Sequence, residues 1–147
     1  MKLWWNVPVE SVHTGRALRA NRPDLRVLLK REKRLVVVEM SCPLDANVPE
    51  KFAEKRAKYG DVIDELRSQH ADEAERVEYA VLVIGALGRV DKGTLLEGLR
   101  VVMGERGEGG EVERVAERMQ KAVVTSTVNI AKAYFRRPGQ TGVAIGV

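Results

Sequence analysis

The first residues whose types and spacing suggest chemistry are two carboxylates, Asp24 and Glu39. They lie in two apolar runs, NRPDLRVLL and RLVVVEMSCP, which the charged break KREK separates. Two such runs around a short polar break predict a β-hairpin. A turn centred between Arg31 and Glu32 pairs Asp24 with Glu39, where side chains are roughly 4.5–5.5 Å apart and like charges repel. A bound metal cation is the commonest reason to tolerate such a pair, so we expect a metal site here.

The second run, Leu35–Met40, is apolar without alternation until Glu39. This pattern is typical of a central strand that is covered on both faces. An ionised carboxylate at the end of a buried strand costs several kcal/mol unless another group compensates it. The alternative to a metal is an ion pair between one of the carboxylates and an arginine, for which the candidates are Arg22, Arg26 and Arg56.

The segment after the hairpin predicts a helix from Pro49 to about Gln69. Its apolar side chains recur at helical spacing on one face, and Gly60 is expected to weaken the helix by about 1 kcal/mol without ending it. At about 100° per residue, Lys55 lies about 40° from the apolar Tyr59, whereas Lys58 lies about 100° away, towards solvent. Lys55 is therefore aimed at the carboxylates, unless it only extends its stem along the core.

The remaining pattern predicts an α/β fold. The apolar run from Val77 to Leu87 follows the long helix, so it should pair parallel to the hairpin's second strand in a βαβ crossover. Asp91 is expected to cap a short helix to about Met103, followed by a flexible linker at 104–110 and a last helix from Glu111 to about Arg136. Residues 137–147 are expected to be disordered. At the N-terminus, Pro8 limits the first extended stretch to a sheet edge, and a loop should follow from His13 to Asn21.

Composition and charge limit the functional classes. With 147 residues, 44% hydrophobic and 31% charged, the chain fits one globular domain, 1–136. No apolar run reaches the length of a membrane span, and the start lacks a signal-peptide core, so we expect a nuclear or intracellular protein without a membrane partner. One cysteine and two histidines exclude an intrachain disulfide and make a zinc finger implausible.

The charge distribution favours a phosphate-bearing partner. The formal net charge is +4 and the pI about 9.4, which permits nucleic-acid binding without requiring it. Four arginines cluster around a single acid, Asp24: Arg16, Arg19, Arg22 and Arg26. This cluster could grip phosphates beside the metal site, or it could be a solvated basic surface. Trp4 and Trp5 could stack on a base, but paired tryptophans near a terminus more often fill a core.

These residues occur in an order that resembles a known family. The sequence RPD, the hairpin, an acid that closes the central strand, S-x-P in SCP, EKRAKY on the next helix and the apolar VIGALG are similar to the restriction-like endonuclease domain of non-LTR retrotransposons. That family resembles the wider PD-(D/E)XK nuclease superfamily. The resemblance covers roughly residues 4–136, and it implies a restriction-endonuclease-like core with a mixed sheet.

The resemblance also has two departures. The superfamily motif places a lysine two residues after the second carboxylate, where this chain has Ser41. The family's usual solution is a lysine on the following helix, which here means Lys55 or, less well placed, Lys58. The sequence also contains neither the reverse transcriptase nor the cysteine-histidine knuckle of complete elements, which indicates an isolated domain, a fragment or a derived host protein.

The resemblance implies a metal-dependent DNA endonuclease that nicks target DNA for retrotransposon insertion. Asp24, Glu39 and the Met40 carbonyl would bind Mg²⁺ or Mn²⁺, and the metal would lower the pKa of a bound water. Lys55 would hold that water or the phosphate. The partners would be double-stranded DNA and a reverse transcriptase domain in the parent element. Possible DNA contacts and accessory groups are Arg16, Arg19, Arg22, Arg26, Lys58, Tyr59, Ser41 and His13.

His13 is the histidine nearest the site and could act as a general base, or it could be an ordinary loop residue.

Two non-catalytic interpretations of the whole domain remain open for the same sequence. The whole domain could be a catalytically inactive nuclease fold that binds DNA or protein. It could also be an oligomerisation domain built on the last helix.

Overall fold

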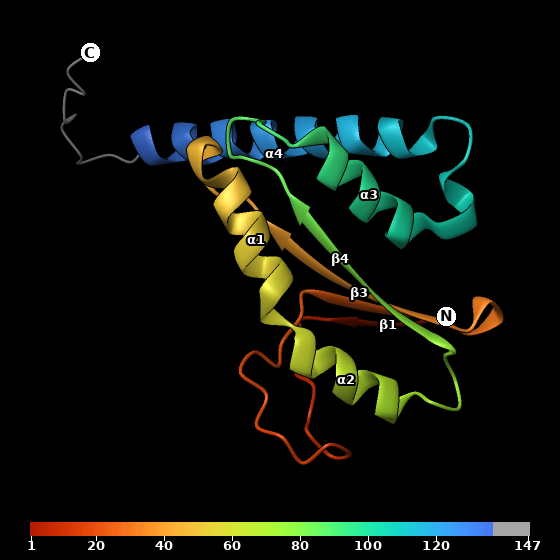
Figure 1. Ribbon diagram of the computed structural model, residues 1–147. Coiled ribbons are helices and arrows are strands. Elements are labelled where there is room, and N and C mark those ends of the chain that lie inside the picture. The colour runs from red at the N-terminus through yellow and green to blue at the C-terminus, as the bar shows by residue number, and fades with distance from the viewer. Residues whose placement is uncertain (137–147) are drawn as a thin grey trace.

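The sheet of the computed structural model has four strands in the order β1-β2-β3-β4 (Figure 1). The structure describes residues 1–136, so the tail predicted to be disordered at 137–147 lies outside the described residues. The strands are β1 Lys2–Trp5, β2 Leu25–Leu29, β3 Arg34–Ser41 and β4 Arg76–Val83. β2 is antiparallel to both β1 and β3, while β3 and β4 are parallel. The predicted α/β class with a mixed sheet is confirmed.

The hairpin of β2 and β3 has the predicted register. Leu25 pairs with Val38 and Leu28 with Leu35, and the charged break forms a short 3-10 helix, η1 Lys30–Glu32, followed by Lys33 at φ +50°. Continuing this register by one residue places Asp24, just before β2, beside Glu39. The sequence predicted this pairing from the charged break, because a turn centred between Arg31 and Glu32 gives the register that β2 and β3 have.

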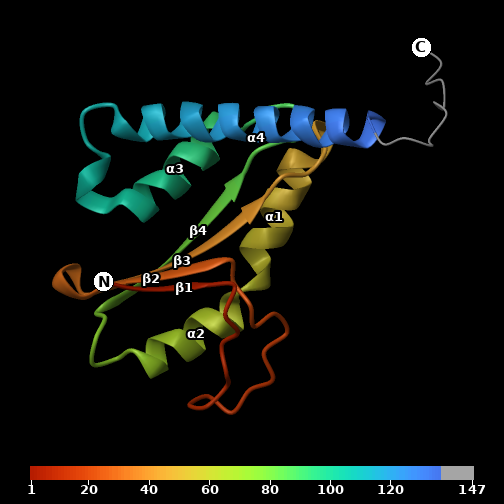
Figure 2. The same cartoon turned by 180° about the vertical axis from the view of Figure 1, so that it is seen from behind.

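The two faces of the sheet are covered by different helices. Leu35 and Val37 of β3 lie in one core cluster with side chains of the segment 59–66, whereas Val36 and Val38 lie in another with Leu95, Leu99 and Val112. Because successive side chains of a strand point to opposite faces, Glu39 shares the face of Leu35 and Val37. Figures 1 and 2 show the helices that cover each face.

The predicted single helix from Pro49 to Gln69 is wrong, because the chain forms two helices, α1 Val48–Lys58 and α2 Gly60–Gln69. Tyr59 between them has φ −109° and ψ 15°, and α2 runs at a clear angle to α1 (Figure 1). The hydroxyl of Tyr79 donates a 2.7 Å hydrogen bond to the carbonyl of Lys55. This is one of the last carbonyls of α1, which have no hydrogen-bond donor within the helix. The break therefore has a tertiary cause besides the low helix propensity of Gly60.

The second half of the chain follows the prediction with shorter elements. β4 ends at Val83, before the predicted Leu87, because the chain then leaves the sheet in a turn at Gly85–Gly88. The carboxylate of Asp91 accepts from the Thr94 amide at 2.9 Å and caps α3 Lys92–Met103. The segment predicted as a linker contains the short 3-10 helix η3 Gly104–Gly107. The last helix is α4 Glu111–Phe135.

The N-terminal segment forms an edge strand and then a long loop. Within residues 1–136, β1 pairs with β2 alone and forms an edge of the sheet, as expected for a stretch that ends before Pro8. Trp4 packs against the first core cluster and lies against the His70 ring, whereas Trp5 is 61% exposed. Residues 6–24 then run as a loop beside α2 (Figures 1 and 2). Among residues 1–136, no helix is long and apolar enough to cross a membrane.

Candidate active site

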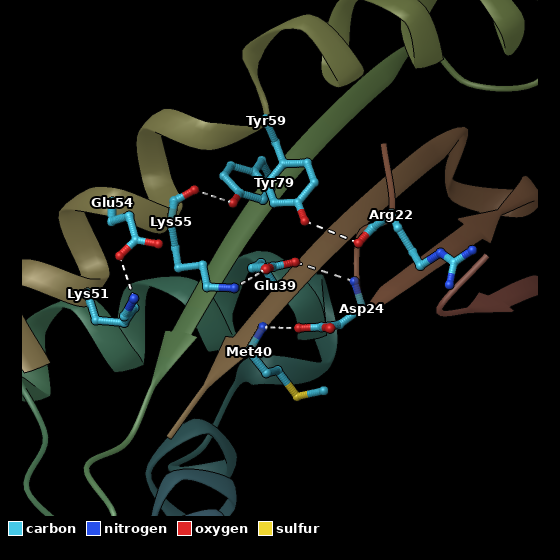
Figure 3. A network of polar contacts seen from close by, with 9 residues as sticks. All are labelled: Arg22, Asp24, Glu39, Met40, Lys51, Glu54, Lys55, Tyr59 and Tyr79. Atoms are coloured by element: carbon cyan, nitrogen blue, oxygen red, sulfur yellow. Dashed lines mark hydrogen bonds and ion pairs between the residues drawn. The ribbon is translucent and has the colours of Figure 1, made fainter. Parts of the chain in front are cut away.

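The centre of the candidate site is an ion pair between Glu39 and Lys55. The Glu39 side chain is 3% exposed and its Oε1 pairs with Lys55 Nζ, whose side chain is 17% exposed. Lys55 reaches the carboxylate from α1, on the face of the sheet where Glu39 points (Figure 3). Ser41 has the same strand parity as Glu39, so the ammonium approaches the face to which the side chain at position 41 belongs. Within residues 1–136, no ion pair joins either carboxylate to the arginines named as alternatives, Arg22, Arg26 and Arg56; the cation beside Glu39 is Lys55 instead.

Asp24 joins this centre through two backbone amides. Its Oδ2 accepts a 2.7 Å hydrogen bond from the Met40 amide, and its own amide lies 3.4 Å from Oε2 of Glu39. β2 begins at Leu25, so Met40 lies beyond the last strand pair on that side. Since the N–H and C=O of an extended residue point to the same side of the strand, the Met40 carbonyl points to the side of Asp24. Figure 3 shows both carboxylates at the open end of the hairpin, with the Met40 amide beside Asp24.

Two tyrosines bind backbone carbonyls next to the lysine and the carboxylates. Tyr59 is 1% exposed and its hydroxyl donates to the Arg22 carbonyl at 3.1 Å, while Tyr79 donates to the Lys55 carbonyl. Their ring centroids are 5.8 Å apart. Burial, followed by the negative charge of Glu39, raises the pKa of both hydroxyls well above the usual range. Both tyrosines are therefore neutral hydrogen-bond donors that fix backbone positions around the site.

All but one of the predicted DNA-binding residues are exposed at the surface. Arg22 is exposed, and its side chain points away from the carboxylates (Figure 3). Lys58 is exposed, with its Nζ 5.1 Å from the centroid of the Tyr59 ring. Arg16 and Arg19 are exposed on the loop beside α2. None of the four contacts Asp24 or Glu39, so each is available to a partner.

Arg26 does not fit the predicted DNA-binding role. It is 5% exposed, its guanidinium lies 5.1 Å from the centroid of the Trp4 ring, and Nη2 donates to the carbonyls of Val7 and Pro8. Its position in β2 has the same parity as the core residue Leu28, which turns it inwards. Burial lowers its pKa. Arg26 therefore holds the N-terminal segment against the sheet, and we leave it out of the DNA-binding set.

His13 and Ser41 have no side-chain contact with the carboxylates. His13 is exposed on the loop, and it is its backbone amide that forms a bond, to Glu65. Ser41 ends β3, and its carbonyl accepts from the Ile84 amide at 3.1 Å. Neither side chain has a contact that indicates a chemical role.

The residues present fit a hard divalent cation with few protein ligands. No group of three or more His, Cys, Asp or Glu side chains that could hold a metal occurs in residues 1–136. Two carboxylates and one carbonyl remain, and in the described part of the chain the only hydrogen bond to the Asp24 carboxylate comes from Met40, to one of its two oxygens. Mg²⁺ characteristically binds one or two carboxylates and keeps several waters, so Asp24 and Glu39 are the residues of this site that could hold it, although both Glu39 oxygens already contact Lys55 and the Asp24 amide.

Two residues of structural importance were not found from the sequence. Tyr79 was counted only as part of an apolar strand, yet it binds the carbonyl of Lys55. Glu65 is 0% exposed and accepts hydrogen bonds from the loop that carries Arg16 and Arg19. The sequence feature that could have revealed Glu65 is its position on α2, about 60° around the helix from the buried Val62. An acid so close to an apolar helix face needs a partner.

Comparison with known proteins leaves the family of the chain open. No family model matches the sequence, and no curated protein does. One solved structure with a partial likeness is the N-terminal domain of a reptarenavirus L protein, at 16% identity and a TM-score of 0.33. The aligned part covers 78% of this chain and 59% of that one.

Proposed function

We propose that this chain is a metal-dependent DNA endonuclease domain similar to the restriction-like endonucleases of non-LTR retrotransposons. The observation that supports it is the convergence of Asp24, Glu39 and Lys55 at the open end of the hairpin. A strand acid, a second acid before the neighbouring strand and a helix lysine provide two metal ligands and a cation within one polar network. As part of the same proposal, the protein works in the nucleus or another intracellular compartment.

Each residue then has a role that follows from its contacts. Asp24 and Glu39, with the Met40 carbonyl, would hold Mg²⁺ or Mn²⁺, and the ion would stabilise charge on the attacked phosphodiester and lower the pKa of a bound water. Lys55 would hold that water or a phosphate oxygen by electrostatic attraction. Two contacts support this role: the ammonium pairs with Glu39, and the Tyr79 hydroxyl holds the backbone carbonyl of Lys55. Arg22, Lys58, Arg16 and Arg19 would contact the DNA backbone.

The alternative proposal is a catalytically inactive nuclease fold that binds DNA or protein. The observation that favours it is the Lys55–Glu39 ion pair itself, which compensates the buried carboxylate without any metal. In an active enzyme this lysine must exchange part of its contact with Glu39 for water or phosphate. In an inactive module the pair would be purely structural.

A plasmid-nicking assay separates the two proposals. We expect the purified chain with Mn²⁺ or Mg²⁺ to convert supercoiled DNA to the open circle, and a chelator to stop the reaction. Asp24→Ala, Glu39→Ala and Lys55→Ala should each lower the rate at least about a hundredfold, as loss of a catalytic acid–base or electrostatic group does.

Two matched variants control for charge and helix position. Lys51→Ala removes a lysine of α1 that pairs with Glu54, and Asp64→Asn removes an acid of α2 that pairs with Arg67. Both should nick at the parent rate. Absence of nicking by the parent, together with salt-sensitive DNA binding, would instead support the inactive module.

A further inference from the structure

Glu65 is a fully buried carboxylate that the proposed nuclease chemistry does not use. It lies on α2 and is 0% exposed, and no ion pair within residues 1–136 includes it. A buried charge without a cation needs several hydrogen bonds to offset the loss of its water. The donors identify what this residue holds in place.

Almost all of these donors come from one loop. Oε1 accepts from the amides of Val12 and His13 at 3.0 and 2.9 Å, and Oε2 accepts from the Thr14 amide at 2.9 Å and the Thr14 hydroxyl at 2.6 Å. Gln69, one turn further along α2, donates to Oε1 at 2.8 Å and also to the Glu10 carbonyl at 2.6 Å. Three successive amides that converge on one anion form a concave nest, here filled by the protein's own carboxylate.

The loop is also closed at its base. The Val9 amide donates to the Asn21 carbonyl at 2.6 Å, and Val9 is 1% exposed in the core. Leu18 and Ala20 pack against the same cluster. A compact surface loop of this length, with ends that meet and side chains that fill it, is an Ω loop, a class that is frequently functional. We call residues 10–20 the Ω loop.

The Ω loop presents unpaired positive charge. Arg16 and Arg19 are exposed and form no ion pair within residues 1–136. Arg16 follows the anchored Thr14 across Gly15 at φ +65°, and Arg19 comes directly after Leu18, which packs against the core. The bonds to Glu65 on one side and the packing of Leu18 on the other thus set the path of the chain that carries both arginines. The hydroxyl of Thr14, the His13 amide and Gln69 hold the pKa of Glu65 far below its usual range, so the carboxylate stays ionised near neutral pH.

We propose that Glu65 is a positioning residue that holds the Ω loop so that Arg16 and Arg19 bind the phosphate backbone of DNA. This inference rests on the proposed function, because it assumes that the same chain binds DNA. Glu65 acts through the loop and does not touch the nucleic acid. A loop held in its bound shape loses less conformational entropy on binding, which is the usual advantage of preorganisation.

A double-mutant cycle tests the positioning role. The affinity for a short duplex DNA is measured in Ca²⁺ for the parent, Arg16→Ala/Arg19→Ala, Glu65→Gln and the triple variant. Glutamine keeps the size of the side chain but turns one acceptor into a donor that the loop amides cannot bind. We expect the arginine substitutions to weaken binding about tenfold in the parent and less than about twofold in the Glu65→Gln background.

The salt dependence gives a second readout. Each lost phosphate contact lowers the steepness of log affinity against log salt by about 0.9. In both the arginine variant and Glu65→Gln, this steepness should fall by the amount expected for up to about two lost contacts. Nicking at saturating plasmid should keep the parent rate in Glu65→Gln, with a raised KM. An equal cost of the arginine substitutions in both backgrounds would overturn the inference, since a merely structural Glu65 would leave their contribution unchanged.

Milder variants keep the test valid if Glu65→Gln folds poorly. Thr14→Val removes only the hydroxyl donor and should show the same non-additivity to a smaller degree, whereas Asp64→Asn, an exposed neighbour on α2, should show none. Trypsin should cleave after Arg16 and Arg19 faster in Glu65→Gln than in Asp64→Asn, and equal rates would contradict the anchor. Failure of the parent to bind or nick DNA would reject the proposed function, whereas nicking by the parent with additive costs would reject only the role of Glu65.

Discussion

The Lys55–Glu39 ion pair buries a charged carboxylate, which costs stability, and leaves the ammonium partly accessible. Glu39 is almost completely buried and Lys55 is 17% exposed, so the ammonium can reach solvent or a phosphate more easily than the carboxylate can. A buried pair is a poor source of net stability, but removal of one partner leaves a buried charge without compensation. Loss of Lys55 should therefore cost stability as well as the activity that we propose for it.

The first residue-scale prediction concerns stability. Lys55→Met should lower the free energy of unfolding by about 3 kcal/mol, because it leaves Glu39 buried and unpaired. The double variant Glu39→Gln/Lys55→Met should recover most of that loss. Urea unfolding followed by circular dichroism measures both values.

Lys51→Met is the matched control for this prediction, since Lys51 pairs with Glu54 at the surface. It should change stability by less than about 1 kcal/mol. A Lys55→Met protein as stable as the parent would mean that Glu39 does not depend on the ammonium, contrary to its contacts.

At the scale of elements, the break between α1 and α2 places the polar network. α1 ends at Lys58, and Tyr59 turns its hydroxyl to the Arg22 carbonyl while Tyr79 binds the Lys55 carbonyl. The same break lets α2 begin at Gly60 and bury Val62 and Leu66. The tyrosine between the two helices thus connects the helix that carries Lys55 to the loop that precedes Asp24.

Two glycines give an element-scale prediction with an internal control. A Cβ at Gly60 meets nothing within 4 Å, and its φ is not in the left-handed region, so Gly60→Ala should stabilise the protein by about 0.5 kcal/mol. A Cβ at Gly98, where α3 crosses β4, would lie 2.9 Å from the Val81 carbonyl oxygen and 2.8 Å from Leu82 Cδ2. Gly98→Ala should therefore destabilise by about 2 kcal/mol. Thermal unfolding of both variants checks the order, and the reverse order would contradict the helix placement.

The last helix bears on the oligomerisation interpretation. The first half of α4 packs against α3 through side chains such as Val112, Val115 and Met119. Towards its C-terminal end the apolar side chains are exposed: Val128, Ile130, Tyr134 and Phe135. The helix thus contributes to the core of this domain over its first half, and its role is not confined to association.

For the whole molecule, the sequence predicted those parts whose causes lie close together in the chain. The hairpin register follows from two apolar runs and the break between them, and the inward aim of Lys55 follows from its spacing to Tyr59. The α/β order follows from the alternation of strand and helix patterns. Each of these depends on local periodicity, which the packing then preserves.

The parts that the sequence did not predict depend on distant partners. The helix break involves Tyr79, which comes from a strand far along the chain, and Glu65 is satisfied by loop amides some fifty residues earlier, whose pattern has no period. Arg26 was assigned to a basic cluster from its neighbours in sequence, yet strand parity turns it against Trp4. Charge clusters along a chain are thus poor guides when strand alternation separates their members.

The most direct measurement of the central claim is a crystal structure of the protein soaked with Mn²⁺, with anomalous scattering used to locate the ion. We predict one site bound by carboxylate oxygens of Asp24 and Glu39 and by the Met40 carbonyl, with metal–oxygen distances of about 2.0–2.2 Å and waters in the remaining positions. Lys55 should then contact one of those waters as well as Glu39. An anomalous map without a peak between Asp24 and Glu39, with the Lys55–Glu39 pair unchanged, would contradict the account.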